Sequence, residues 1–138
     1  MVTGGGHAAL EDANMSHYLA VGVGGCLGSI ARYWLSGAVH RYWNSGFPYG
    51  TLAVNVLGCL LLGCVIGLVE YRQLFGPSAR LFLVVGILGG FTTFSAFGYE
   101  TFALLRDNQF LLALGNVTAN VVTGVLAVMA GWFLAKFF

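Results

Sequence analysis

The sequence predicts an all-α integral membrane protein with four transmembrane helices, and three observations support this fold class. First, 58% of the 138 residues are hydrophobic and only 8% are charged, whereas about a quarter are charged in a typical soluble domain. Second, four apolar stretches are each long enough for a membrane-spanning helix, which needs about 20 residues. Third, the segments between these stretches are too short to hold a soluble domain. This composition excludes an ordinary soluble enzyme, and a net charge of +1 leaves no basic surface for nucleic acid.

The predicted helices cover residues 16–39, 50–69, 81–105 and 110–135. Residues 1–15 are largely polar and glycine-rich and contain no Lys or Arg, so they are predicted to form a disordered or extended N-terminus. Residues 16–138 then form a single four-helix transmembrane domain. Small-residue spacings of the GxxxG type permit close helix packing, and they occur at Gly24 and Gly28, Gly63 and Gly67, and Gly86 and Gly90.

The basic residues do not favour one orientation in the membrane. Lys and Arg normally remain on the cytoplasmic side. Here one side carries Arg72, Arg80 and Lys136, and the other carries Arg41 and Arg106, with Arg32 toward the same side. This balance predicts that the chain inserts in both orientations and forms an antiparallel, dual-topology homodimer.

Polar side chains inside the first two predicted helices need a partner or a function, because they are costly in a bilayer. Arg32 lies within the first apolar run, where it either snorkels to the interface or provides a positive charge at the mouth of an anion path. Asn55 lies well inside the second helix. Its amide either bonds neighbouring helices or donates hydrogen bonds into a permeation path.

The third predicted helix contains an unusual segment, GILGGFTTFSAFGYET, over residues 86–101. Glycines followed by Thr92, Thr93 and Ser95 weaken the helix and predict a break at mid-span. A break of this kind is tolerated only inside protein or beside a cavity, where it can bind Na⁺. Phe94 and Phe97 follow it and either pack against neighbours or line an anion path with their positive ring edges. Glu100 is expected to cap this segment or to pair with an arginine.

The fourth predicted helix carries Asn116, Asn120 and Thr123 at positions i, i+4 and i+7, which form one face. This stripe either hydrogen-bonds to another helix or faces a polar path. No metalloprotease, P-loop or dinucleotide-binding motif occurs in the chain, and no catalytic triad can be assembled from its residues. An enzyme is therefore not expected.

Three segments in register resemble the signatures of the Fluc family, the small CrcB-type fluoride channels. They are GGCLGSIARYWLSG in the first helix, GTLAVNVLGCLLLG in the second and GGFTTFSAFGYET in the third. The resemblance covers nearly the whole chain after Met15. It implies an antiparallel homodimer with two pores that allows passive fluoride efflux across the cytoplasmic membrane and so relieves fluoride toxicity.

The resemblance also implies roles for individual residues. The ion pathway would contain Asn55, the phenylalanine pair Phe94 and Phe97, and Ser95 on a polar track. Arg32 would lie near the vestibule, and the fourth helix would contribute Asn120 and Thr123. A structural Na⁺ would be held at the helix break by the backbone carbonyls of Gly89 and Thr92. Ala96 departs from the family pattern, which often has Ser or Thr there.

One alternative function is a small proton-coupled multidrug exporter, a class that also forms antiparallel dimers of four short helices. Such exporters depend on a glutamate inside the first helix. The first helix here carries Arg32 instead, and the embedded Glu100 lies near the end of the third helix. The sequence therefore favours the fluoride channel.

Overall fold

The computed structural model describes residues 4–43 and 45–138, with side chains from Asn14 onward apart from residue 44. Within these ranges the chain is entirely helical and has no strand, which confirms the predicted all-α class. The elements are α1 (Gly4–Tyr42), α2 (Tyr49–Arg72), α3 (Pro77–Arg80), the π-helix η1 (Leu81–Leu88), α4 (Gly89–Phe91), α5 (Phe94–Arg106), α6 (Phe110–Leu134) and the 3₁₀ turn η2 (Ala135–Phe137).

Helix α1 begins well before the predicted start at residue 16. Residues from Ala8 to Glu11 favour a helix, and the backbone is helical from Gly4 onward. In the described residues, the backbone of this segment therefore continues the first helix. The division into a tail and a domain of residues 16–138 stays a prediction.

The third predicted helix is confirmed as broken, because α3, η1 and α4 form its first half and α5 forms its second. Three stretches are long and apolar enough to cross a membrane, judged by length and composition over the described residues: Tyr49–Arg72, Pro77–Arg106 and Phe110–Phe137. Helix α1 is long enough but is not among them, because Arg32 and several glycines lower its mean hydropathy. That α1 is a fourth span stays a prediction.

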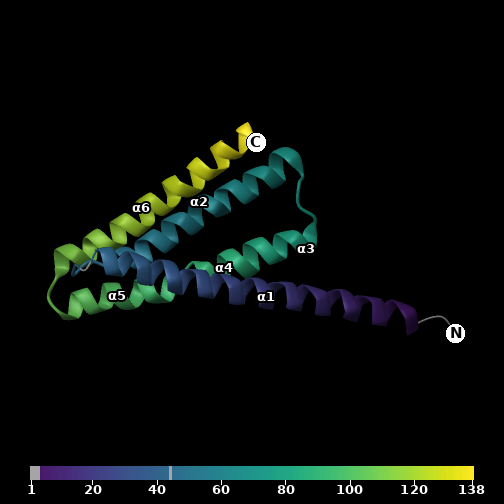
Figure 1. Ribbon diagram of the computed structural model, residues 1–138, viewed down its shortest axis with the longest axis horizontal. Coiled ribbons are helices and arrows are strands. Elements are labelled where there is room, and N and C mark those ends of the chain that lie inside the picture. The colour runs from purple at the N-terminus through teal and green to yellow at the C-terminus, as the bar shows by residue number, and fades with distance from the viewer. Residues whose placement is uncertain (1–3, 44) are drawn as a thin grey trace.

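Two pairs of helical segments build the fold (Figure 1). Helix α2 packs along α6, and α1 packs along η1 and α4. The pairs converge at the end where α5 lies and spread apart toward the chain termini. The break in the third helix contacts both pairs. Arg32 of α1 donates a hydrogen bond to the Thr92 carbonyl, and Asn55 of α2 accepts one from the Thr93 nitrogen.

Glycines bring the helices of each pair into backbone contact. A Cβ atom at Gly28 would overlap the carbonyl oxygen of Ile87 and would lie 2.8 Å from the nitrogen of Phe91. A Cβ at Gly63 would overlap the carbonyl oxygen of Val128 in the same way. The predicted GxxxG positions therefore serve packing within one chain.

The outer ends of α2 and α6 carry aromatic and charged side chains. The ammonium group of Lys136 lies 4.7 Å from the centre of the Trp132 ring, and the Trp132 indole donates a hydrogen bond of 2.8 Å to Glu70. Aromatic and basic side chains of this kind gather at the interface between lipid and water. This cluster is consistent with α2 and α6 ending at the same membrane surface.

Candidate functional site

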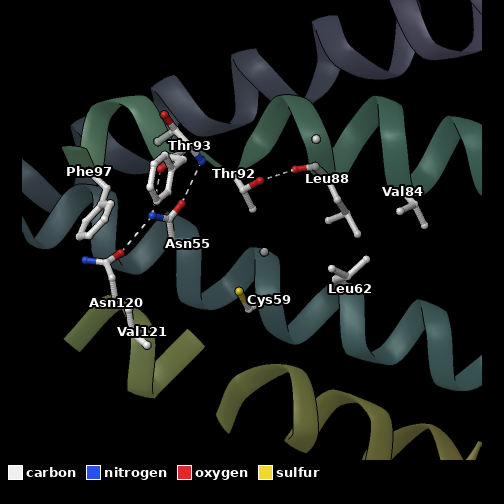
Figure 2. A pocket seen from close by; sticks show the side chains of 13 residues that line it. Asn55, Cys59, Leu62, Val84, Leu88, Thr92, Thr93, Phe97, Asn120 and Val121 are labelled. Carbon is white, nitrogen blue, oxygen red and sulfur yellow. Dashed lines mark hydrogen bonds between the residues drawn. The ribbon is translucent and has the colours of Figure 1, made fainter. Parts of the chain in front are cut away.

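The break in the third helix consists of Thr92 and Thr93, which both have extended backbone conformations. Thr93 caps α5, because its hydroxyl oxygen accepts a hydrogen bond of 3.2 Å from the backbone nitrogen of Ala96. The Thr92 hydroxyl donates to the carbonyl of Leu88 at 3.0 Å (Figure 2). The hydroxyl groups that disfavour a continuous helix in the sequence thus stabilise the two ends of the break.

Asn55 from α2 satisfies the backbone that the break exposes (Figure 2). Its Oδ1 accepts from the backbone nitrogen of Thr93 at 2.9 Å, and its Nδ2 donates to the Thr93 carbonyl at 3.1 Å. The same Nδ2 donates to Oδ1 of Asn120 at 3.0 Å. These contacts bond neighbouring helices, which is one of the two uses that the sequence leaves open for Asn55. Its place in a permeation path stays a prediction.

Asn120 is held in turn by Asn116, one turn earlier on α6. Its Nδ2 donates to both the backbone carbonyl and Oδ1 of Asn116, at 3.0 and 2.9 Å. Asn116 donates to the hydroxyl of Thr101 on α5 at 2.9 Å. The polar stripe of the fourth helix therefore bonds to α2 and α5, so two of its three predicted members face other helices.

The two phenylalanines of the predicted pathway lie side by side after the break. The ring centroids of Phe94 and Phe97 are 5.5 Å apart and the rings are inclined by 54°. Both line a cavity of about 400 Å³ together with Asn55 and Asn120 (Figure 2). Phe94 is 83% exposed in the single chain, so this wall of the cavity is open to a neighbouring molecule.

A second, wider cavity of about 960 Å³ lies between α1 and the start of α2. Arg32 and Glu100 line it, and Thr93 lines both cavities. Thr93, at the helix break, is therefore common to the walls of both cavities. Arg32 donates a long hydrogen bond of 3.4 Å to the Thr92 carbonyl, which places its positive charge beside the break.

Glu100 is bound to Thr51, whose hydroxyl donates to Oε1 at 2.6 Å. Its Oε2 is shielded from solvent and has no hydrogen-bond partner among the described residues. The expectation that Glu100 caps the segment or pairs with an arginine is wrong for the residues that the structure describes, because the carboxylate instead accepts a hydrogen bond from Thr51 of α2 and forms no ion pair there. Sequence reasoning missed Thr51, since a single threonine near a helix start carries no distinctive spacing.

Two predicted site residues, Ser95 and Thr123, line neither cavity. The Ser95 hydroxyl is exposed and lies 3.3 Å from the Thr93 hydroxyl, so it is linked to the break through that residue. Thr123 is exposed, donates to the carbonyl of Ala119 in its own helix at 2.5 Å, and lines neither cavity. The single chain thus brings Asn55, Phe94, Phe97 and Asn120 together and leaves Thr123 apart.

The break also frees backbone oxygen atoms that could hold a cation. In a continuous helix the Thr93 nitrogen would donate to the Gly89 carbonyl, but here it donates to Asn55. Gly89 and Thr92 line the same cavity. Among the described residues no group of three or more His, Cys, Asp or Glu side chains could bind a metal. The oxygen atoms at the break are the neutral carbonyls of Gly89 and Thr92, a kind of ligand that Na⁺ takes, and the Thr92 oxygen also accepts the long hydrogen bond from Arg32.

Comparison with known proteins identifies the family of the chain. A family model described as CrcB-like protein, Camphor Resistance (CrcB), matches residues 19–132. Curated relatives named fluoride-specific ion channel FluC align over nearly their full length. The Geobacter sulfurreducens relative is 44% identical over 122 residues, which is 88% of this chain and 98% of the relative.

Two further relatives agree with this assignment. The Chloroflexus aurantiacus protein is 40% identical over 124 residues, which is 90% of this chain and 98% of the relative. The Nitratidesulfovibrio vulgaris protein is 44% identical over 122 residues, which is 88% of this chain and 98% of the relative. Both carry the same name, fluoride-specific ion channel FluC. With its apolar helices, its broken third helix and these relatives, the chain is a multi-pass membrane protein that belongs to the CrcB-like family.

Proposed function

We propose that this protein is a fluoride-selective channel, not an enzyme, that allows passive fluoride efflux across the cytoplasmic membrane and so relieves fluoride toxicity. The observation that carries this proposal is the pair of cavities that share Thr93 in their walls, one beside Arg32 and the other beside the phenylalanine pair. The names of the relatives supply the ion, since each is called a fluoride-specific ion channel.

The chemistry of the two cavities suits a small, strongly hydrated anion. Arg32 raises the local concentration of anions in the wide cavity. Beyond the break, the Thr93 hydroxyl and the positive ring edges of Phe94 and Phe97 replace part of the water shell. None of these groups except Arg32 carries a full charge, so the anion is not trapped. A narrow path of this kind excludes the larger chloride ion by size.

The proposed channel is an antiparallel, dual-topology homodimer with two pores. Phe94 is 83% exposed and forms a wall of the first cavity, which suggests that a second copy closes the cavity on this side. The balanced basic residues at the two membrane surfaces support opposite insertion of the two copies. Residues from both copies would then line each pore, including Ser95 and Thr123, which stand apart from the cavities in the single chain.

Helix α1 is the fourth membrane span in this proposal. It packs along η1 and α4, which belong to the broken third helix. That helix is long and apolar enough to cross the membrane, so α1 would cross the membrane beside it. Its backbone contacts at Gly24 and Gly28 require this neighbour. Arg32 then faces the wide cavity and the Thr92 carbonyl instead of lipid, which makes the charge tolerable at that depth.

A structural Na⁺ at the break is part of the same proposal. The carbonyls of Gly89 and Thr92 would hold it. When bound, the cation supplies positive charge that fixes these carbonyls and hence the broken helices. Gly89 fits this role best, since the partner of its carbonyl in a continuous helix is engaged by Asn55.

Fluoride efflux from liposomes tests the function directly. Purified protein in liposomes loaded with potassium fluoride is expected to release fluoride rapidly when a potassium ionophore balances charge, and to release no chloride in a parallel sample. Phe97→Leu is expected to reduce fluoride release, because it keeps an apolar side chain but removes the ring edge. Phe102→Leu on the same helix lies outside both cavities and serves as the matched control. A folded dimer that releases no fluoride would overturn the proposal.

A further inference from the structure

A chain of side-chain hydrogen bonds runs beside the first cavity and joins α2, α6 and α5. Asn55 donates to Asn120 at 3.0 Å, and Asn120 donates to Asn116 at 2.9 Å. Asn116 donates to the Thr101 hydroxyl at 2.9 Å, and this hydroxyl donates to the carbonyl of Phe97 at 2.8 Å. Every bond in the chain points in the same direction, from the second helix to the carbonyl of a pore phenylalanine.

Backbone groups fix the direction of this chain. The Asn55 oxygen must face the Thr93 nitrogen, which can only donate. The Asn120 nitrogen must face the backbone carbonyl of Asn116, which can only accept. These two contacts fix the orientation of the Asn55 and Asn120 amides. The Asn116 oxygen must therefore accept the hydrogen bond from Asn120, and the Asn116 nitrogen donates to Thr101. A reversed amide at any point would place two acceptors or two donors together.

The chain uses all the amide hydrogens of two residues that line the cavity. A carboxamide nitrogen carries two hydrogens. Asn55 directs its two to Thr93 and Asn120, and Asn120 directs its two to the carbonyl and side chain of Asn116. In the single chain these four hydrogens are therefore all engaged within the protein. The bonds hold the break and link it to the turn that carries Phe97.

We infer that Asn116 is a positioning residue of the proposed channel, and this inference rests on the proposed function. Its side chain is fully buried, with an exposed fraction of 0%, and it does not line either cavity. Through Asn120 it sets the amide of Asn55, and through Thr101 it fixes the turn of α5 that carries Phe97. Asn116 thus links Asn55 and Phe97, which both line the first cavity, without lining that cavity itself.

Thr101 offers the sharpest test, because it can be changed without altering its volume. Thr101→Val removes the acceptor for Asn116 and the donor for Phe97, whereas Thr101→Ser keeps both. Thr118→Val is the matched control, since Thr118 is an exposed threonine of α6 and lies outside the hydrogen-bond chain. All three variants are reconstituted with the unchanged protein, and fluoride release and dimer elution are measured for each.

The expected result is that Thr101→Val releases fluoride at least about tenfold more slowly, the factor that about one lost hydrogen bond represents. Thr101→Ser and Thr118→Val are expected to stay within about twofold, and all variants elute as the unchanged protein does. Asn116→Leu should show the same defect, and the double variant Asn116→Leu with Thr101→Val should be no slower than the slower single variant. Equal rates for Thr101→Val and Thr118→Val, or additive losses in the double variant, would overturn the inference.

A second readout does not depend on fluoride flux. Hydrogen exchange of the Asn55 and Asn120 side-chain amides, followed by NMR in detergent, is expected to accelerate in Thr101→Val and to stay unchanged in Thr118→Val. If the unchanged protein conducts no fluoride but this difference appears, the proposed function fails and the hydrogen-bond chain stands. If the amides exchange equally fast in all proteins, the positioning role of Asn116 is refuted whatever the flux.

Discussion

The backbone nitrogen of Thr93 lies 2.9 Å from Oδ1 of Asn55, in place of the carbonyl of Gly89 that a continuous helix would offer it. A side chain of α2 thus completes the backbone of the third helix. The same amide donates to the Thr93 carbonyl at 3.1 Å, so it holds the peptide group at the start of α5 from both sides. Since Phe94 follows directly, this contact fixes the start of the helix that carries the phenylalanine pair.

Replacing Asn55 by Leu is expected to destabilise the protein by about 1–3 kcal/mol, because the Thr93 nitrogen then loses its partner away from water. The measurement is the thermal unfolding of the purified protein in detergent, followed by circular dichroism. Thr118→Val, which removes an exposed polar group elsewhere, is expected to unfold at the same temperature as the unchanged protein. Equal stability of Asn55→Leu and Thr118→Val would show that the break does not need the amide.

A methyl group at Gly28 is expected to destabilise the contact between α1 and the third helix. Its Cβ would overlap the Ile87 carbonyl, which is backbone and cannot move aside alone. Overpacking of this kind costs about 1–3 kcal/mol. Gly22→Ala is the matched control in the same helix, because its Cβ meets no atom within 4 Å. There the alanine is expected to be neutral or to stabilise the helix by up to about 1 kcal/mol.

Unfolding midpoints of the two alanine variants in the same detergent decide this prediction. A Gly28→Ala protein as stable as Gly22→Ala would mean that α1 does not pack against η1 and α4 as described. A loss confined to Gly28→Ala supports the placement of α1 beside the third helix.

Thr51→Val is expected to lower the free energy of unfolding, because Glu100 loses a hydrogen bond. The hydroxyl bonded to Oε1 disappears, and Oε2 already lacks a partner among the residues that the structure describes. The loss is about 1–2 kcal/mol. Adding Glu100→Gln to Thr51→Val replaces the carboxyl group that has lost its hydrogen-bond partner by a neutral amide. The double variant is therefore expected to recover part of the stability. Denaturation of the three proteins measures this, and a double variant no better than Thr51→Val would contradict it.

Sodium removal provides a test of the cation at the break. A ligand that binds only the folded state at about 100 times its dissociation constant stabilises by about 2.7 kcal/mol. Exchange of Na⁺ for the bulky cation N-methylglucamine is therefore expected to lower the unfolding temperature and the dimer fraction, and Na⁺ added back should restore both. Identical unfolding curves in the two buffers would argue against a bound sodium ion.

The sequence predicts the position of the helix break well, because its causes are local. Paired glycines weaken the helix, and Thr92 and Thr93 offer hydroxyls that replace backbone partners within a few residues. The close approach of helices at Gly28 and Gly63 is also visible in the sequence, since small residues at this spacing have few other uses in a membrane helix.

The partners of buried polar groups could not be predicted, because they depend on helix rotation and depth. Asn55 has two plausible uses in the sequence, and only the neighbouring helices show that its hydrogens are engaged by Thr93 and Asn120. Asn116 is recognisable as part of a polar stripe, but its burial comes from the packing of α6 on α2 and α5. The pairing of Glu100 with Thr51 joins two helix ends whose registers the sequence leaves free.

The contact between Asn55 and Thr93 joins residues 38 positions apart in the chain. During synthesis, the second span therefore leaves the ribosome before the group that it must satisfy. A third span inserted alone would expose unpaired backbone to hydrocarbon, at a cost of several kcal/mol. The break consequently forms only after the second and third spans have met in the membrane. Biogenesis thus begins with an intact third helix or with a preassembled pair of spans, and the kink is a product of assembly.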